Sequence, residues 1–265
     1  MIGTGSGSRY VEEACMAQAH VEVFHSEKKI FLMRKLKSIS EILPEDEDIL
    51  WRLPMAIEQH PAGYDLARDH QHPDGCHLIL DGFACRHKSL ADGQRQILSF
   101  HTPGDIPDLQ GLHFKTMDFG VTTLIPTTVG YISHTSLYDL TRHRLGLAHA
   151  FWRDIITDGA IFRVWILNIG RRTAHERIAH LLCEMAMRFE AVGLAKNRSY
   201  EAPLAQVDIG DALGLSAVQV NRVLQDFSRG CLVITKADSL EVIDFKGLAQ
   251  ICDFDPSYLH LGRSA

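Results

Sequence analysis

The chain has 265 residues, an apolar content of 46% and a formal net charge of −6. These values exclude a disordered chain, leave room for two modest domains, and argue against a protein that coats nucleic acid through bulk positive charge. No run of about 18 apolar residues occurs, so no membrane span and no membrane partner are expected. The six cysteines form no CxxC pair, which favours a reducing cytoplasm over a disulfide framework.

The N-terminal segment begins with MIGTGSGS, which lacks the basic and hydrophobic regions of a signal peptide. We expect residues 1–21 to form a flexible tail. Residues 22–43 have a helical pattern, and Pro44 begins another short helix.

The next segment, from about residue 55 to residue 132, contains short strand-like runs separated by turns. Asp81-Gly82 and Asp92-Gly93 are preferred hairpin turns, and Pro103-Gly104-Asp105 is a third break. Strands at this spacing predict a β-sandwich, so residues 22–136 are assigned to an N-terminal sandwich domain of the jelly-roll type.

Two cysteines and a histidine in this domain are candidate metal or redox residues. If Asp81-Gly82 closes a hairpin, Leu78 pairs with Cys85 and Cys76 pairs with His87, all on one inner face. Cys76, Cys85 and His87 together offer soft ligands for zinc or haem, or thiols for oxidation. The simpler interpretation is favoured, in which buried cysteines act as small hydrophobes and the histidine is a satisfied core group. No metal or cofactor is therefore predicted.

An enzyme is the alternative class of protein. His70-Gln71-His72 resembles the His-x-His pair of metal-dependent cupin enzymes, which are also β-sandwiches, but no Glu follows it. No nucleophile–base–acid set and no phosphate-binding glycine loop occur either. We therefore expect no catalytic residues.

A single long helix is predicted over residues 137–170. Phe151, Ile161 and Trp165 form one apolar line along it. A second line advances in alternating steps of four and three residues, which is a heptad seam. A helix with two apolar faces needs two partners, and the simplest second partner is another copy of the chain, giving a homodimer. The predicted dimer seam consists of Ala148, Trp152, Ile155, Gly159, Phe162, Ile166 and Ile169.

The segment from residue 206 to residue 229 reads as two short helices joined by a turn at Gly214. Ser216 and Gln219 have the spacing of a capping box at the start of the second helix. Its apolar residues at i, i+3, i+4 and i+7 fix a buried face, which leaves a polar stripe facing outward. Two β-type runs, 231–235 and 240–243, follow and predict a wing with Lys236 at its tip. Two short helices followed by a wing are typical of a winged helix-turn-helix, whose second helix reads base edges in the major groove of DNA. The outward stripe of the second helix and the lysine of the wing are therefore the predicted DNA-reading residues: Ser216, Val218, Gln219, Asn221, Arg222, Gln225, Arg229 and Lys236.

A β-sandwich, a long helix and a winged helix in this order resemble the Crp/Fnr family of bacterial transcription regulators. The motifs that carry the resemblance are LILDGFA (78–84), ADGQRQILSFHTPGD (91–105), ERIAHLL (176–182) and DALGLSAVQVNRVLQ (211–225). The resemblance implies an α+β fold with a sensor sandwich, a dimerisation helix and a C-terminal winged helix-turn-helix domain over 171–265. It also implies a cytoplasmic homodimer that binds an inverted-repeat operator in double-stranded DNA and contacts RNA polymerase.

The sequence departs from the family at two functional sites. Val218 stands where the family has a base-reading Glu, although Arg222 matches the following Arg. The positions of the family's cyclic-nucleotide clamp hold Asp108-Leu109 and Phe119-Gly120, so no guanidinium is available there for a phosphate. Cyclic AMP is therefore disfavoured as the effector. An N-terminal iron–sulfur cluster is also disfavoured, since Cys15 stands alone there. A metal-, haem- or redox-sensing member of the same family remains an alternative.

Overall fold

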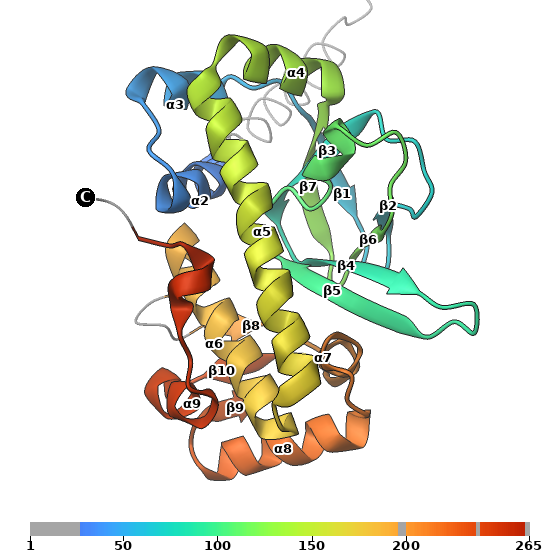
Figure 1. The fold of residues 1–265 in the computed structure, drawn as a ribbon, viewed down its shortest axis with the longest axis vertical. Helices are drawn as coiled ribbons and strands as arrows, with labels where there is room; N and C mark the ends of the chain where they lie inside the picture. The colour runs from blue at the N-terminus through green and yellow to red at the C-terminus, as the bar shows by residue number, and fades with distance from the viewer. Residues whose placement is uncertain (1–26, 196–199, 237–238, 263–265) are drawn as a thin grey trace, which may run out of the picture.

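The computed structural model describes residues 27–195, 200–236 and 239–262 of the chain. The predicted tail, Cys15 and the two residues after Lys236 lie outside this part. Figure 1 shows a β domain packed beside a long central helix, with a helical domain at one end of that helix. The α+β fold with a sandwich and a winged helix is confirmed. Within the described residues, no helix combines the length and hydrophobicity needed to cross a bilayer.

In the part of the chain that the structure describes, two helices precede the strands. Helix α2 spans Ile30–Ile39 and α3 spans Pro44–Trp51, so the helix predicted over 22–43 covers a shorter stretch among the described residues. The backbone turns extended at Ser40, which ends α2. Pro44 occupies the first turn of α3, where its missing N–H is no loss.

The β domain is built from two antiparallel sheets, with strand orders β1-β7-β3 and β2-β6-β4-β5. Buried apolar side chains from both sheets face inward, as expected for a sandwich. A short 3-10 helix, η1 (Leu109–Leu112), follows β5. The strands are β1 (Ala56–His60), β2 (Asp65–Ala67), β3 (Gly75–Asp81), β4 (Ala84–Ser89), β5 (Arg95–His101), β6 (Gly120–Thr123) and β7 (Thr127–Ser133).

The hairpin predicted at Asp81-Gly82 is wrong. Strand β3 pairs with β7, whereas β4 pairs with β5 and β6, so this turn carries the chain from one sheet to the other. Gly82 has a φ of +102° and approaches Thr127 too closely for a side chain. In contrast, Asp92-Gly93 does lie in a hairpin, between β4 and β5.

The changed pairing separates the three candidate metal or redox residues. Cys76 lies in the core beside the N-terminal helices, and Cys85 lies in the core that faces the helical domain. His87 hydrogen-bonds to Thr122 Oγ1 at 2.8 Å. Burial raises the pKa of the Cys85 thiol to about 12, which disfavours the reactive thiolate. No group of three metal-ligating side chains occurs in the part of the chain that the structure describes.

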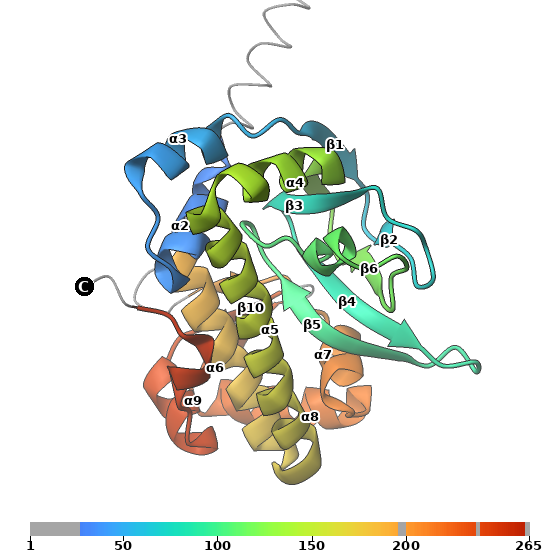
Figure 2. The same cartoon turned by 45° about the horizontal axis from the view of Figure 1, so that its top comes forward.

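The predicted single helix over 137–170 is two helices. Helix α4 (His134–His143) ends at Arg144, and α5 (Leu145–Arg171) begins directly after it. Arg144 has an extended backbone with φ −134° and ψ 87°, and its guanidinium is held by Asp46 of α3 at 2.7 Å. Gly146 follows two residues later, and a Cβ there would lie 2.7 Å from Asp46 Oδ2. Figure 2 shows α4 lying across the β domain while α5 runs toward the helical domain.

The C-terminal domain is a winged helix. Helix α6 (Ala174–Val192) leads into α7 (Gln206–Leu213) and α8 (Ala217–Arg229). The wing sheet has the order β8-β10-β9. Its strands are β8 (Glu201–Ala202), β9 (Val233–Thr235) and β10 (Leu240–Val242).

A C-terminal strap follows the wing, and it consists of α9 (Phe245–Cys252) and the 3-10 helix η2 (Pro256–Leu259) with the residues up to Gly262. Helix α9 packs on α6, and η2 packs on α5. The Gly262 N–H donates to Ser38 O at the end of α2. The strap therefore runs back from the helical domain along the long helix to the end of α2 (Figure 1).

Candidate nucleic-acid interface

The turn between α7 and α8 depends on two glycines. Gly214 ends α7 in the left-handed conformation, with φ +64°. Gly210 faces the turn so closely that a Cβ there would lie 2.7 Å from Leu215 O. These two positions let α8 cross α7 tightly, which is the geometry of a helix-turn-helix.

The capping box predicted at the start of α8 is present. The Ser216 hydroxyl accepts from the Gln219 N–H, and Gln219 Oε1 accepts from the Ser216 N–H at 2.9 Å. This reciprocal pair holds the first turn of the helix. It also commits the Gln219 carbonyl oxygen to the cap, which leaves the amide NH2 as the free polar group of that side chain.

The predicted inner and outer faces of α8 are both observed. Its buried residues are Val220, Val223, Leu224 and Phe227. All eight predicted DNA-reading residues are exposed, and Val218 is 79% exposed. A shallow hollow of about 400 Å³ runs along the outer face of α8. Its lining comprises Gln206, Ala217, Val218, Asn221, Arg222 and Gln225.

The charges along α8 are not equally available. Arg229 lies 3.4 Å from Asp226, which also contacts His175 at 3.0 Å. Arg222 makes no ion pair with any residue of the described ranges, and its side chain points to solvent. Arg222 is therefore the free guanidinium of the stripe, positioned to contact a base edge or a phosphate.

The positive charge of Lys236, at the base of the wing tip, is partly neutralised by two carboxylates. Its Nζ lies 3.0 Å from Glu201 and 3.7 Å from Glu241. The hydrogen bond to Glu201 raises the pKa of Lys236, so the ammonium stays charged. Contact with a phosphate would have to compete with these two carboxylates.

The β4–β5 hairpin contacts α7, the first helix of the helix-turn-helix. Arg95 of β5 contacts Asp208 at 2.6 Å and Asp211 at 2.9 Å, both on α7. Gln96 of the same strand donates to Ala212 O at 3.1 Å. These contacts could not be predicted from the sequence, because Arg95 and its partners lie more than 110 residues apart.

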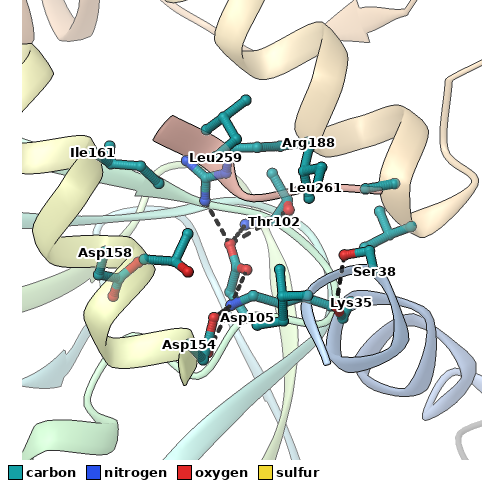
Figure 3. Close-up of a pocket in the computed structure, with 14 residues that line it drawn as sticks. Lys35, Ser38, Thr102, Asp105, Asp154, Asp158, Ile161, Arg188, Leu259 and Leu261 are labelled. Atoms are coloured by element: carbon teal, nitrogen blue, oxygen red, sulfur yellow. Dashed lines mark hydrogen bonds and ion pairs between the residues drawn. The ribbon is translucent and has the colours of Figure 1, made fainter. Parts of the chain in front are cut away.

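A buried ion cluster joins the two domains beneath the long helix (Figure 3). Lys35 of α2 contacts Asp105 at 2.7 Å and Asp154 of α5 at 2.8 Å. Arg188 of α6 contacts the same Asp105 at 2.9 Å. Burial opposes ionisation of Asp105, yet the charges of Lys35 and Arg188 hold its pKa well below the usual range. Such a paired, buried carboxylate fixes α2, α5 and α6 against the β domain.

A second buried guanidinium crosses the position of the family's nucleotide clamp. Arg86 of β4 is 1% exposed. Its Nε donates to Pro107 O, and its Nη1 contacts Asp158 of α5 at 2.8 Å. The guanidinium lies 5.2 Å from the centre of the Phe119 ring. Arg86 therefore contacts the loop before Asp108, the Phe119 ring just before β6, and the long helix. The expectation that no guanidinium lies at the clamp position is wrong, although this one is already paired with Asp158.

The two apolar lines of α5 face different surroundings. Phe151, Ile161 and Trp165 are buried, as expected for the line that packs within the subunit. The seven residues of the predicted dimer seam are all at least partly exposed, and Trp152 and Ile166 are 63% and 72% exposed. This face of α5 is therefore open at Trp152, Ile166 and Ile169, whereas Ile155 packs against the core of its own subunit and Phe162 lies 6.0 Å from the Arg86 guanidinium.

Comparison with known proteins gives two family matches. A cyclic nucleotide-binding domain matches residues 57–144, and a Crp-like helix-turn-helix domain matches residues 176–251. Together with the exposed stripe of α8, these matches define the protein as a DNA-binding transcription regulator and not an enzyme.

The relatives are regulators of one family. The chain is 25% identical to the nitrogen fixation regulation protein FixK of Rhizobium meliloti (strain 1021), over 76% of this chain and 89% of that protein. It is 29% identical to the transcriptional activator protein FnrA of Stutzerimonas stutzeri, over 63% and 69% of the two chains. The solved structure of FixK2 from Bradyrhizobium japonicum is 25% identical with a TM-score of 0.67, covering 75% of this chain and 98% of that one. The chain belongs to the Crp/Fnr family.

Proposed function

We propose that the protein is a cytoplasmic homodimer that places α8 of each copy in the major groove of an inverted-repeat operator. The observation that carries this proposal is the rigid, capped α8, whose outer face presents Asn221, Arg222 and Gln225 to solvent. Amide and guanidinium groups on the N-terminal half of such a helix match the hydrogen-bonding pattern of base edges. In a twofold dimer, the half-sites should lie about one helical turn apart.

The test is Arg222→Ala, measured by fluorescence anisotropy on an operator selected from random DNA. We expect a loss of about 1–3 kcal/mol on the operator and little change on random DNA. Arg52→Ala is the matched control, since Arg52 is an exposed arginine of α3 far along the chain from α8. An equal loss on both DNAs would show that Arg222 only positions the protein on the phosphate backbone.

Assembly into a dimer is supported by the exposed apolar seam of α5. A charged substitution at Ile155 or Phe162 should give monomers and abolish operator binding, because a charge buried in the seam has no partner there. Sedimentation of the unmutated protein as a monomer at micromolar concentration would contradict the dimer. The relatives named as activators favour activation of transcription through contact with RNA polymerase.

The side chains at the clamp positions support the proposal that this regulator does not respond to cyclic AMP. Asp108 is buried and accepts from the His77 N–H at 2.8 Å and contacts His77 Nδ1 at 2.6 Å. The Arg86 guanidinium contacts Pro107 O, next to Asp108, and lies 5.2 Å from the centre of the Phe119 ring. A nucleotide would have to displace the Arg86–Asp158 pair and place its phosphate near the Asp108 carboxylate. Calorimetric titration with cyclic AMP should show no binding, and micromolar affinity would overturn this part of the proposal.

A further inference from the structure

An open apolar pocket lies beside the predicted dimer seam. Its volume is about 530 Å³, which suits a large side chain or a small organic molecule. One wall is η1 and the residues after it, and the other wall is α5. The apolar lining comprises Leu109, Leu112, Phe114, Ala148, Phe151 and Ile155. No side chain of the described residues fills this volume.

One residue that lines the pocket, Gln110, has an unmatched polar atom. Its Oε1 is buried and has no hydrogen-bond partner among the residues that the structure describes, so the side chain has to turn toward the pocket before an occupant can donate to this oxygen. A buried carbonyl oxygen without a donor costs free energy, so the occupant of the pocket should bring an N–H or O–H group. The expected occupant is therefore apolar with a single donor.

Trp152 has these two properties and lies at the edge of the same pocket. Its ring is 63% exposed, and its Nε1–H is a donor without acceptor capacity. In a parallel pair of helices, the heptad spacing places the two Trp152 side chains opposite each other near the twofold axis. Two indole rings are too large to share that layer, so each must turn sideways, toward the pocket of the facing copy.

We propose that the pocket between η1 and α5 is a socket for Trp152 of a second copy of this chain, whose indole N–H donates to Gln110. This inference rests on the proposed homodimer and adds the anchor of its interface. By twofold symmetry each dimer contains two such sockets. The contact also links η1, at the clamp position of the β domain, to the partner's long helix.

The experiment measures the dimer dissociation constant of the full chain by sedimentation. Trp152→Ala should raise this constant at least 30-fold, about 2 kcal/mol, as expected for a buried aromatic anchor. Leu43→Ala is the matched control, because Leu43 is an exposed apolar residue at the start of α3 and should leave the constant unchanged. Circular dichroism checks that each variant is folded.

The hydrogen bond is tested separately. Trp152→Phe keeps an aromatic ring but removes the donor, so it should weaken the dimer about fivefold in the native background and little in a Gln110→Leu background. Acrylamide quenching of tryptophan fluorescence should also fall as the dimer forms, since Trp152 becomes shielded.

The outcomes separate the two proposals. If the unmutated chain is monomeric, the homodimer fails and the socket fails with it. If the chain is dimeric but Trp152→Ala dissociates no more readily than Leu43→Ala, the dimer stands and the socket is refuted. Quenching that stays constant over the concentrations at which sedimentation shows the dimer dissociating would also refute the socket, because Trp152 would then be no better shielded in the dimer than in the monomer.

Discussion

Glu184 of α6 is the side chain whose replacement should test the packing around α5 most directly. It is fully buried, and its Oε2 accepts from Trp165 Nε1 of α5 at 3.0 Å and from the Tyr258 hydroxyl of the C-terminal strap at 2.9 Å. Arg188 lies 3.7 Å from its other oxygen. One carboxylate thus ties α5, α6 and the strap.

Glu184→Leu leaves the buried Trp165 donor without an acceptor, whereas the half-buried Tyr258 hydroxyl keeps His180 Nε2 at 3.4 Å as a neighbour. One unpaired buried donor costs about 1–3 kcal/mol, so the variant should lose at least about 1–3 kcal/mol of unfolding free energy. Glu184→Gln retains a carbonyl oxygen that accepts from both donors, and it should lose about 1 kcal/mol or less. Burial already raises the pKa of Glu184, which limits the cost of removing its charge.

The assay is urea unfolding followed by far-UV circular dichroism, with the native chain, Glu184→Leu and Glu184→Gln measured side by side. A Leu variant within about 1 kcal/mol of the native chain would show that the two donors find other partners. A Gln variant as unstable as the Leu variant would show that the charge, rather than the acceptor, holds the strap. Either result would refute the reasoning.

Two further substitutions probe the turn and the buried charges. Gly210→Ala should lower the free energy of unfolding by about 1–3 kcal/mol and weaken operator binding, because its Cβ would lie 2.7 Å from Leu215 O. Gly170→Ala is the control, since its Cβ would meet nothing within 4 Å and should be neutral or stabilising. Equal operator binding by the two variants would contradict the close approach at Gly210. Burial, with the nearby charge of Arg86, lowers the pKa of His101 from 6.5 to about 4, so between these values the unfolded chain binds the extra proton and stability falls as the pH falls. His101 contributes about 2 kcal/mol to the loss from pH 7 to pH 5, and His180, whose pKa burial lowers to about 3, adds a loss of its own. His101→Gln should remove the His101 share, whereas replacing the exposed His72 by Gln should not. An unchanged pH dependence in His101→Gln would argue against a buried neutral imidazole.

Local patterns in the sequence were sufficient to predict the winged helix. The capping box at Ser216 and the four apolar positions of α8 lie within one short segment, so the periodicity that defines them does not depend on distant parts of the chain. The seam of α5 could be recognised for the same reason, although its dimeric role remains a proposal. The DNA-reading roles of the eight exposed residues likewise remain predictions.

Features that depend on distant residues were not predictable in the same way. Asp81-Gly82 has the residues of a hairpin turn, but strand pairing in a sandwich is decided by non-local contacts, and β3 finds β7 about 50 residues later. At the end of α4, Arg144 and Gly146 both lie against Asp46, nearly 100 residues earlier, which the sequence pattern around Arg144 does not reveal. The ion cluster around Asp105 gathers charges from four separate elements, none of which forms a motif by itself.

The ion pairs between Arg95 and α7 restrict the operators that the proposed dimer can bind. The β4–β5 hairpin holds Asp208 and Asp211 of α7, and α8 packs tightly against α7. Each α8 is therefore fixed to its own β domain and is not joined to it through a flexible linker alone. The separation and mutual rotation of the two α8 helices are then rigid properties of the assembly. Inserting about five base pairs between the half-sites moves the second half-site to the opposite side of the duplex. A reader on a flexible linker follows such a change, whereas we expect the proposed dimer to keep a single spacer length and to lose one of its two half-sites.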